Sequence, residues 1–195
     1  MCGLFAYTGP ADPDPDQLQA AAAAAAARGP HGHGWATSGH AHHALGPLAP
    51  RDVRTIQARA VIGHARLATV GDYRDPAQLQ PLTADGHQLA HNGTVHNWPA
   101  LAPHATTDSA VLASRYAHAR TRGLAPAAAL ATVLEGAQTD SWALVVLDAD
   151  GTLLHWRQRL PIWAHRDPTG LYLASRRHHP DARPTRPDTI HEEGP

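Results

Sequence analysis

The 195-residue chain contains only one cysteine, Cys2, and no lysine. A single cysteine excludes an internal disulfide and is typical of a protein from a reducing compartment. No apolar run approaches the roughly 20 residues that a helix needs to span a bilayer. The first residues also lack the basic stretch and long apolar core of a secretory signal. We therefore expect a soluble cytoplasmic protein with no membrane partner.

The chain also has no excess of positive or negative charge. The 16 arginines oppose 17 acidic residues, and the formal net charge is −1. This balance gives no reason to expect nucleic acid or an anionic membrane surface as a partner. The length is sufficient for one domain with a substantial core.

Histidine is abundant, with 16 residues, and five of them lie close together in the first quarter of the chain. These five are His31, His33, His40, His42 and His43. A spacing of one residue on a strand can place two imidazoles on one face, as some metal sites require. No carboxylate or cysteine cluster completes such a site here. We therefore expect solvated surface histidines, no metal ion and no cofactor.

Helix signals occur in two parts of the chain. We expect helices at residues 14–27, 52–57 and 108–122, and a fourth from residue 126 to just before Gly136. The alanine run at residues 20–27 has the highest helix propensity available and predicts a thin helix packed closely on a sheet. Asp108 is the expected N-cap of the third helix.

Strand patterns account for most of the remaining chain. We expect strands at residues 2–8, 35–45, 58–69, 87–91, 142–147, 152–157, 160–165 and 171–175. Asp150-Gly151 predicts a hairpin turn. The order of elements fits an α+β fold with two sheets and helices outside them. Residues 176–195 are rich in Pro, Arg and His without periodicity, so we expect a disordered tail.

Four separated segments could together cleave an amide. The segments are Cys2-Gly3, residues 63–71, His91-Asn92-Gly93 and Thr107-Asp108-Ser109. The Cys2 thiol is a nucleophile that needs a base. Its own α-amine, once Met1 is removed, has a reference pKa of about 7.7–8.0 and lies close to the sulfur.

The other segments supply the remaining needs of the reaction. The side-chain amide of Asn92 and the backbone N–H of Gly93 could stabilise an oxyanion. Arg66 suits a bidentate contact to a substrate carboxylate, and Asp108 suits an ammonium. Each residue also has an ordinary explanation: a structural arginine, a two-residue Asn-Gly turn and a helix cap. The hypothesis depends on their occurring together.

In this order the segments resemble the class II glutamine amidotransferase domain, an N-terminal-nucleophile hydrolase. The matching segments are Cys2-Gly3-Leu4, Arg28-Gly29-Pro30, residues 63–71, residues 91–97, Thr107-Asp108-Ser109 and the closing strands at 157–175. The resemblance runs from Cys2 to about Ser175, so it implies an amidotransferase domain at residues 1–175 followed by the tail. It also implies a four-layer αββα sandwich of two mainly antiparallel sheets.

The resemblance implies a catalytic role for three residues. Cys2 would be the nucleophile and, through its freed α-amine, the base. Asn92 and Gly93 would form the oxyanion hole. These roles imply that glutamine is hydrolysed to glutamate and ammonia through a Cys2 thioester.

Four residues would bind the substrate. Arg66 would hold the α-carboxylate of glutamine and Asp108 its α-ammonium, while Thr69 and Val70 would line the pocket. The chain carries no Ser-Gly-Gly-x-Asp-Ser pyrophosphate loop and no sugar isomerase segment. We therefore expect the ammonia to pass to a separate synthase chain.

Two other hypotheses stay open. Leu67 and Val70 are small compared with the Trp and His of sugar-phosphate-synthesising members, which would leave room for another γ-glutamyl amide. The second hypothesis is a domain that keeps the fold and binds a ligand or partner without turnover. That domain would retain Met1, because an attached Met1 blocks the base.

Overall fold

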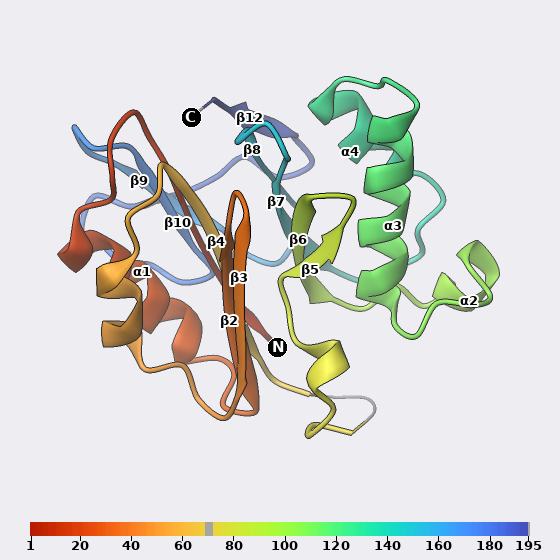
Figure 1. Cartoon of the computed structure of the whole chain (residues 1–195), viewed down its shortest axis with the longest axis horizontal. Coiled ribbons are helices and arrows are strands. Elements are labelled where there is room, and N and C mark those ends of the chain that lie inside the picture. Colours follow the sequence, from red (N-terminus) through yellow and green to blue (C-terminus); the bar gives the residue numbers. More distant parts are fainter. Residues whose placement is uncertain (69–71, 195) are drawn as a thin grey trace.

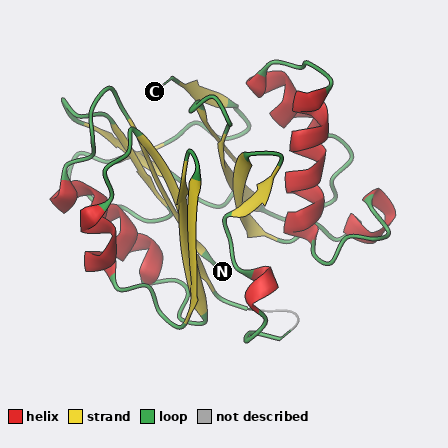
Figure 2. Cartoon of the chain, in the orientation of Figure 1, coloured by secondary structure: helices red, strands yellow, loops and turns green. Residues whose placement is uncertain are grey.

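The computed structural model describes residues 1–68 and 72–194. Two antiparallel sheets stack face to face, with helices over their outer faces (Figures 1 and 2). The larger sheet contains, in spatial order, β11 (Arg183–Pro184), β9 (Trp163–Arg166), β10 (Leu171–Ala174), β1 (Gly3–Thr8), β4 (Ala60–Arg66), β2 (Gly32–Thr37) and β3 (His40–Leu45). The smaller sheet contains β12 (His191–Glu193), β8 (Leu153–Arg157), β7 (Trp142–Leu147), β6 (His87–Gly93) and β5 (Leu82–Ala84).

Helices form the two outer layers. The larger sheet is covered by α1 (Pro15–Ala26), against which the 3-10 helix η1 (Pro50–Thr55) packs, and the smaller sheet by α3 (Asp108–Thr121) with α4 (Pro126–Leu134) alongside it. Two short elements, η2 (Pro76–Gln78) and α2 (Trp98–Leu101), lie in the connections. The α+β prediction and the four-layer αββα sandwich are confirmed.

The alternation of side chains along the strands creates three buried clusters. In β1, Leu4 and Ala6 belong to the cluster between the sheets, whereas Phe5 and Tyr7 pack beneath α1. A third cluster fills the space between the smaller sheet and the α3–α4 layer. The nucleophile candidate therefore begins a strand that is buried on both faces.

Helix α1 approaches the larger sheet unusually closely, as the alanine run predicts. Ala21, Ala22 and Ala25 are fully buried on its inner face. A Cβ at Gly3 would lie 2.1 Å from the carbonyl oxygen of Ala25, so only glycine fits at that point of β1. This contact fixes the backbone next to Cys2.

Several elements differ in detail from the sequence-based expectations. The expected strand at 35–45 is a hairpin of β2 and β3, and the short strand β5 was not predicted. Strand β6 continues through Asn92 and Gly93, which pair with Ala143 and Trp142 of β7 instead of forming a turn. The predicted hairpin of β7 and β8 at Asp150-Gly151 is confirmed.

The expected disorder of the tail is corrected for residues 176–194. Strand β11 pairs with β9, and β12 pairs with β8, so the tail adds one edge strand to each sheet. His191 stacks on His155 at a ring-centroid distance of 4.4 Å. Local periodicity does not reveal such short strands, because their partners lie far away in the sequence.

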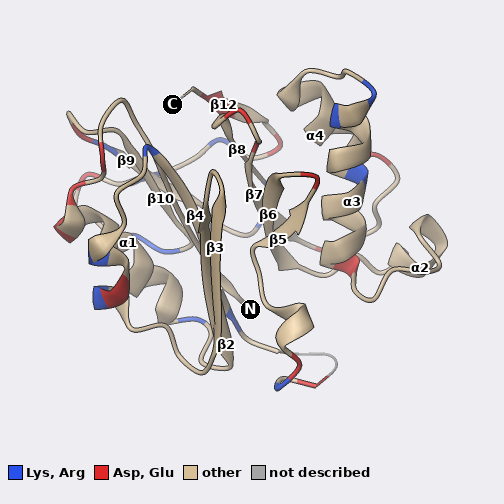
Figure 3. Cartoon of the chain, in the orientation of Figure 1, with Lys and Arg blue, Asp and Glu red and all other residues tan. Residues whose placement is uncertain are grey.

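No helix among the described residues has the length and apolar character needed to cross a membrane. Basic and acidic residues are interspersed along the helices and loops (Figure 3). This distribution agrees with the balanced charge of the sequence.

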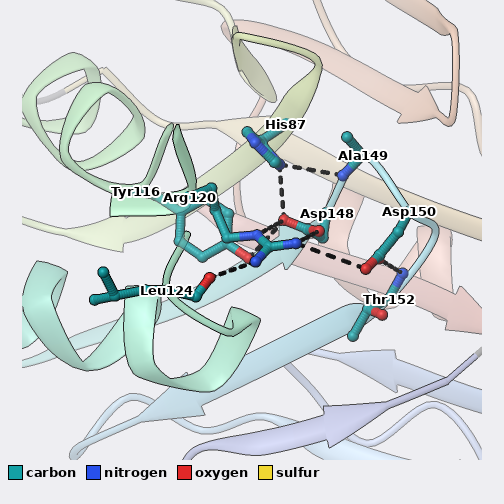
Figure 4. A network of polar contacts seen from close by, with 8 residues as sticks. All are labelled: His87, Tyr116, Arg120, Leu124, Asp148, Ala149, Asp150 and Thr152. Carbon is teal, nitrogen blue, oxygen red and sulfur yellow. Dashed lines mark hydrogen bonds and ion pairs between the residues drawn. The ribbon is translucent and has the colours of Figure 1, made fainter. Parts of the chain in front are cut away.

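A buried polar network ties α3 to the far end of the smaller sheet (Figure 4). Arg120 donates from Nε and Nη2 to the two carboxylate oxygens of Asp148, at 3.0 and 2.9 Å. The Tyr116 hydroxyl donates to Asp148 Oδ1 at 2.8 Å, and His87 Nδ1 lies 2.7 Å from the same oxygen. The Asp148 side chain is fully buried, so the network compensates a charge that would otherwise be costly there.

We expect Asp148→Asn to lower the free energy of unfolding by about 3 kcal/mol, because it leaves Arg120 without its buried partner. Burial alone would raise the pKa of the Asp148 carboxyl, but hydrogen bonds from Arg120 and Tyr116 outweigh it and lower that pKa. The stabilisation is therefore complete above the unfolded pKa of about 3.9 and disappears as the pH falls below it. Urea unfolding at several pH values measures both effects.

The control is Asp150→Asn, because Asp150 is half-exposed and lies 3.7 Å from Arg120. It should change the free energy of unfolding by less than about 0.5 kcal/mol. Equal losses in the two variants, or a wild-type advantage that persists unchanged below pH 3, would contradict the assignment.

Candidate active site

Five of the seven sequence-predicted site residues meet at one edge of the sandwich: Cys2, Arg66, Asn92, Gly93 and Asp108. Cys2 directly precedes β1, and Arg66 ends the antiparallel strand β4, with Gly3 opposite Ala65. In the other sheet, β6 ends at Gly93. Antiparallel pairing brings the start of one strand beside the end of its neighbour, which is how residues 64 positions apart become neighbours.

Two cavities adjoin at Cys2. We name the first the clamp cavity; its volume is about 190 Å³ and its lining includes Cys2, Arg66, Gln78, His91, Trp98 and Asp108. We name the second the Met1 cavity; its volume is about 220 Å³ and its lining includes Met1, Cys2, Asn92, His96, Asp140 and Leu160. Cys2, Leu67, Gly93 and Thr94 line both. The candidate nucleophile thus borders two adjoining cavities.

The Cys2 thiol is held against the loop that follows β4. The backbone N–H of Leu67 lies 3.4 Å from Sγ, and the Leu67 carbonyl oxygen lies 3.6 Å from it. Burial raises the pKa of the Cys2 thiol above its usual value, against the smaller opposing effect of the Leu67 contact. The thiol is therefore protonated at neutral pH, and a reaction at this sulfur requires a base.

Arg28 anchors the backbone of Cys2. Its Nε donates to the Cys2 carbonyl oxygen at 2.8 Å, and its Nη1 lies 3.4 Å from the Ser175 carbonyl oxygen. Ser175 Oγ in turn accepts from the backbone N–H of Leu4 at 2.7 Å. Arg28 belongs to the Arg28-Gly29-Pro30 segment, for which the sequence predicted no role. The structure assigns it the positioning of Cys2.

Asn92 and Gly93, which were expected to form an oxyanion hole, line the Met1 cavity together with Cys2. Asn92 is 1% exposed, and within the described residues neither its side-chain oxygen nor its nitrogen has a hydrogen-bond partner. Gly93 has a φ of 142°, and a Cβ there would lie 2.7 Å from the Ser141 carbonyl oxygen. A buried amide without a partner is costly, so the free Nδ2 is available for a ligand oxygen.

Arg66 is buried and extends into the clamp cavity. Its guanidinium contacts the side-chain oxygen of Gln78 and lies 3.3 Å from the Tyr73 carbonyl oxygen. These partners are neutral, and among residues 1–68 and 72–194 no carboxylate lies within 4.0 Å of Arg66. The positive charge is therefore free to pair with an anionic ligand.

Asp108 supplies the opposite charge in the same cavity, at the acidic first turn of α3 (Figure 3). The expected helix cap is corrected: Thr107 is the N-cap and accepts from the Ala110 N–H, while Asp108 is the first helical residue. Asp108 Oδ2 accepts from the Val95 N–H at 3.0 Å, and Oδ1 accepts from the Ser109 N–H at 2.7 Å. These contacts orient the carboxylate without neutralising it.

A buried relay behind Asp108 was missed from the sequence. His91 Nδ1 lies 3.1 Å from Ser109 Oγ, which lies 3.3 Å from Asp108 Oδ1. Gln80 donates to Ser109 Oγ at 3.0 Å and accepts from the His91 N–H at 2.7 Å. Burial lowers the pKa of His91, so its ring is neutral and does not compete for the carboxylate. No local pattern could have joined Gln80 to Ser109.

Three further residues of the predicted segments have different outcomes. Thr69 and Val70, predicted to line the substrate pocket, lie outside the described residues. His64 is completely buried between the sheets, and burial lowers its pKa to about 3. A histidine that is neutral, buried and absent from the lining of both cavities is not the base for Cys2.

Within residues 1–68 and 72–194, no group of three or more His, Cys, Asp or Glu side chains could hold a metal ion. His33, His42 and Trp35 instead lie beside one another on β2 and β3, with ring centroids 5.5 to 5.9 Å apart.

No protein-family model matches the chain, and no curated protein is significantly similar to it in sequence.

Solved structures do match. The glutamine phosphoribosylpyrophosphate (PRPP) amidotransferase of B. subtilis, complexed with ADP and GMP, has a TM-score of 0.68 and 20% identity. An allosteric regulatory enzyme of purine biosynthesis has a TM-score of 0.69 and 19% identity. Each match covers 89% of this chain and 42% of the other. The chain has the fold of the glutamine amidotransferases.

A smaller structure with this amidotransferase fold is a predicted glutamine amidotransferase from Pseudomonas aeruginosa. Its TM-score is 0.55 at 15% identity, and the match covers 98% of this chain and 92% of that one. The chain therefore spans about two-fifths of the length of the first two solved structures and nearly the whole of the third.

Proposed function

We propose that the chain is a glutaminase that releases glutamate and ammonia, with residues 1–175 carrying the catalytic groups. The observation that supports this most is the set of groups around Cys2. Two side chains of opposite charge line the clamp cavity, and a side-chain amide without a hydrogen-bond partner lines the Met1 cavity. Arg66 and Asp108 line one side of the sulfur, and Asn92 and Gly93 lie beside it. A free amino acid carries both a carboxylate and an ammonium, which matches the pair of charges in the clamp cavity.

In the proposed first step, the Cys2 α-amine takes the thiol proton and Sγ attacks the side-chain carboxamide of glutamine. A new S–C bond forms, and the carbonyl oxygen becomes an oxyanion that accepts from Asn92 Nδ2 and the Gly93 N–H. The C–N bond then breaks, the α-ammonium returns its proton to the leaving nitrogen, and ammonia departs.

In the second step, the α-amine takes a proton from water, and the oxygen of that water attacks the thioester. The C–S bond breaks, the thiol is reprotonated, and glutamate leaves. The raised pKa of the Cys2 thiol makes the neighbouring amine necessary, because the resting thiol is protonated. Removal of Met1 is therefore part of the proposal.

The proposal includes a separate synthase chain that receives the ammonia. It also includes a cytoplasmic location, which the single, unpaired cysteine favours.

The direct test is to incubate the Met1-free protein with glutamine and quantify glutamate and ammonia. Equimolar release of both products supports the proposal. A protein that retains Met1 and binds glutamine without turnover would instead support the non-catalytic hypothesis. Mass spectrometry of the same sample establishes the state of the N-terminus.

We expect Arg66→Lys to raise the KM for glutamine about tenfold and to change kcat by less than about twofold. The lysine keeps the charge but loses the planar fork, which costs roughly one charged hydrogen bond of about 1.5 kcal/mol. Steady-state kinetics of glutamate release measures both constants. Arg54→Lys is the control, because Arg54 pairs with Asp16 at the surface and lines neither cavity. An unchanged KM in Arg66→Lys would remove Arg66 from substrate recognition.

A further inference from the structure

The proposed reaction would bring the leaving group toward the Met1 cavity. In the proposed reaction the leaving nitrogen receives its proton from the Cys2 α-amine, so that nitrogen must approach this amine. In the unprocessed chain the same nitrogen carries Met1, and Met1 lines the Met1 cavity. The clamp cavity holds the two charged residues, so the glutamyl part of a substrate occupies the other side.

The Met1 cavity is much larger than ammonia needs. Its volume is about 220 Å³ while Met1 is still attached, and a water-sized molecule takes about 30 Å³. The cavity therefore has several times the room that one ammonia molecule needs. Removal of Met1, which is 61% exposed, widens it further.

Two residues that line this space carry buried polar side-chain atoms. Within the described residues, the side-chain atoms of Asn92 and the hydroxyl of Ser141 are buried without a hydrogen-bond partner, and both residues line the Met1 cavity. If Asn92 Nδ2 serves the oxyanion, its Oδ1 remains as an acceptor for the N–H of a leaving amine. A ligand with hydrogen-bonding groups could satisfy these buried polar atoms.

The outer wall of the cavity is already formed and carries a negative charge. The His96 N–H donates to the Gln138 carbonyl oxygen at 2.8 Å, and the Asn97 side chain bonds Gly136 and Gln138 at 2.8 and 2.9 Å. These bonds join the two loops that form the wall. Asp140 is 95% exposed, and its carboxylate lies 3.2 Å from His96 Nε2. Arginine is absent from the lining, so a cation is the charge that fits.

We propose that the Met1 cavity is a binding site for the amine half of γ-glutamyl amides, with preference for an amine that carries a second, cationic group. The inference rests on the proposed Cys2 chemistry and names its substrate class. Sγ forms the thioester, the C–N bond breaks, and the leaving primary amine takes its proton from the Cys2 α-ammonium. Water then releases glutamate as it does with glutamine.

The test compares three substrates with the Met1-free protein: glutamine, its N-butyl amide and its N-(4-aminobutyl) amide. All carry the same γ-glutamyl group, and glutamate release gives kcat/KM for each. We expect the butyl amide to retain at least a tenth of the glutamine value. The aminobutyl amide should exceed the butyl amide by about fivefold at most, because a solvent-exposed charge pair contributes up to about 1 kcal/mol.

Asp140→Asn should remove most of this fivefold ratio between the two amides. Asp150→Asn, an exposed aspartate on the β7–β8 turn that lines neither cavity, should leave the ratio unchanged. An unchanged ratio in Asp140→Asn, or equal rates for both amides, overturns the cationic preference.

The rates with glutamine and with the butyl amide distinguish a failure of this inference from a failure of the proposed function. If glutamine is hydrolysed and the butyl amide falls below a tenth of its kcat/KM, the cavity is only an exit for ammonia and the inference is overturned alone. If no substrate releases glutamate, the proposed function fails and the inference fails with it. Cleavage of the amides without cleavage of glutamine supports the inference and corrects the substrate.

Discussion

We expect Cys2→Ala to lower glutamate release by about 10⁴-fold or more, to the level of uncatalysed hydrolysis. The substitution removes the atom that forms the thioester, and no other cysteine exists in the chain to replace it. Cys2→Ser should also be severely impaired, because a hydroxyl is a weaker nucleophile than a thiol. Continuous measurement of glutamate gives kcat for all three proteins.

The loss of activity identifies Cys2 as the nucleophile only if both variants fold as the wild type does. Cys2 lies at the start of β1 and is only partly buried, so both variants should melt within a few degrees of the wild type. A chain that retains Met1, identified by its mass, should be as inactive as Cys2→Ala because its α-nitrogen is an amide without basicity. Full activity in Cys2→Ala, or in the Met1-bearing chain, would refute the proposed mechanism.

The second-largest effect is expected for Asn92→Ala, which should lower kcat by about 10²–10³-fold with little change in KM. Asn92 Nδ2 stabilises charge that develops on the carbonyl oxygen only as Sγ attacks, so its loss raises the barrier and leaves ground-state binding intact. Steady-state kinetics with glutamine separates the two constants.

Gln88→Ala is the matched control. Gln88 is a buried amide on the same strand, β6, but it hydrogen-bonds Thr83 at the opposite end and lines neither cavity. It should alter stability and not kcat. Similar losses of kcat in the two variants would mean that Asn92 acts through the fold of β6, and a kcat near wild type in Asn92→Ala would remove it from the oxyanion hole.

Much of the fold follows from local sequence. The buried strand β1, the alanine helix α1 between Asp14 and Gly29, and the β7–β8 hairpin all depend on neighbouring residues, and all were predicted. The predictions failed where the partner is distant. The tail strands β11 and β12 are two and three residues long, and each exists only because an edge strand is available to pair with it.

The candidate site also has features that the sequence predicted and features that depend on distant parts of the chain. Residue types and their resemblance to a family were sufficient to select Cys2, Arg66, Asn92, Gly93 and Asp108. Their environments were not predictable, because a pKa or a free hydrogen-bonding group depends on what surrounds it. The neutral partners of Arg66 and the relay behind Asp108 come from segments whose spacing along the chain carries no signal.

The sequence by itself determined which groups could react: one thiol, one family-like order of segments and two opposite charges. Only the tertiary structure decided how space is divided around the thiol. The register of β1 on β4 and the stacking of β6 against them leave one cavity on the charged side and a second on the Met1 side. That division arises from long-range packing between two sheets, and no local pattern encodes a volume.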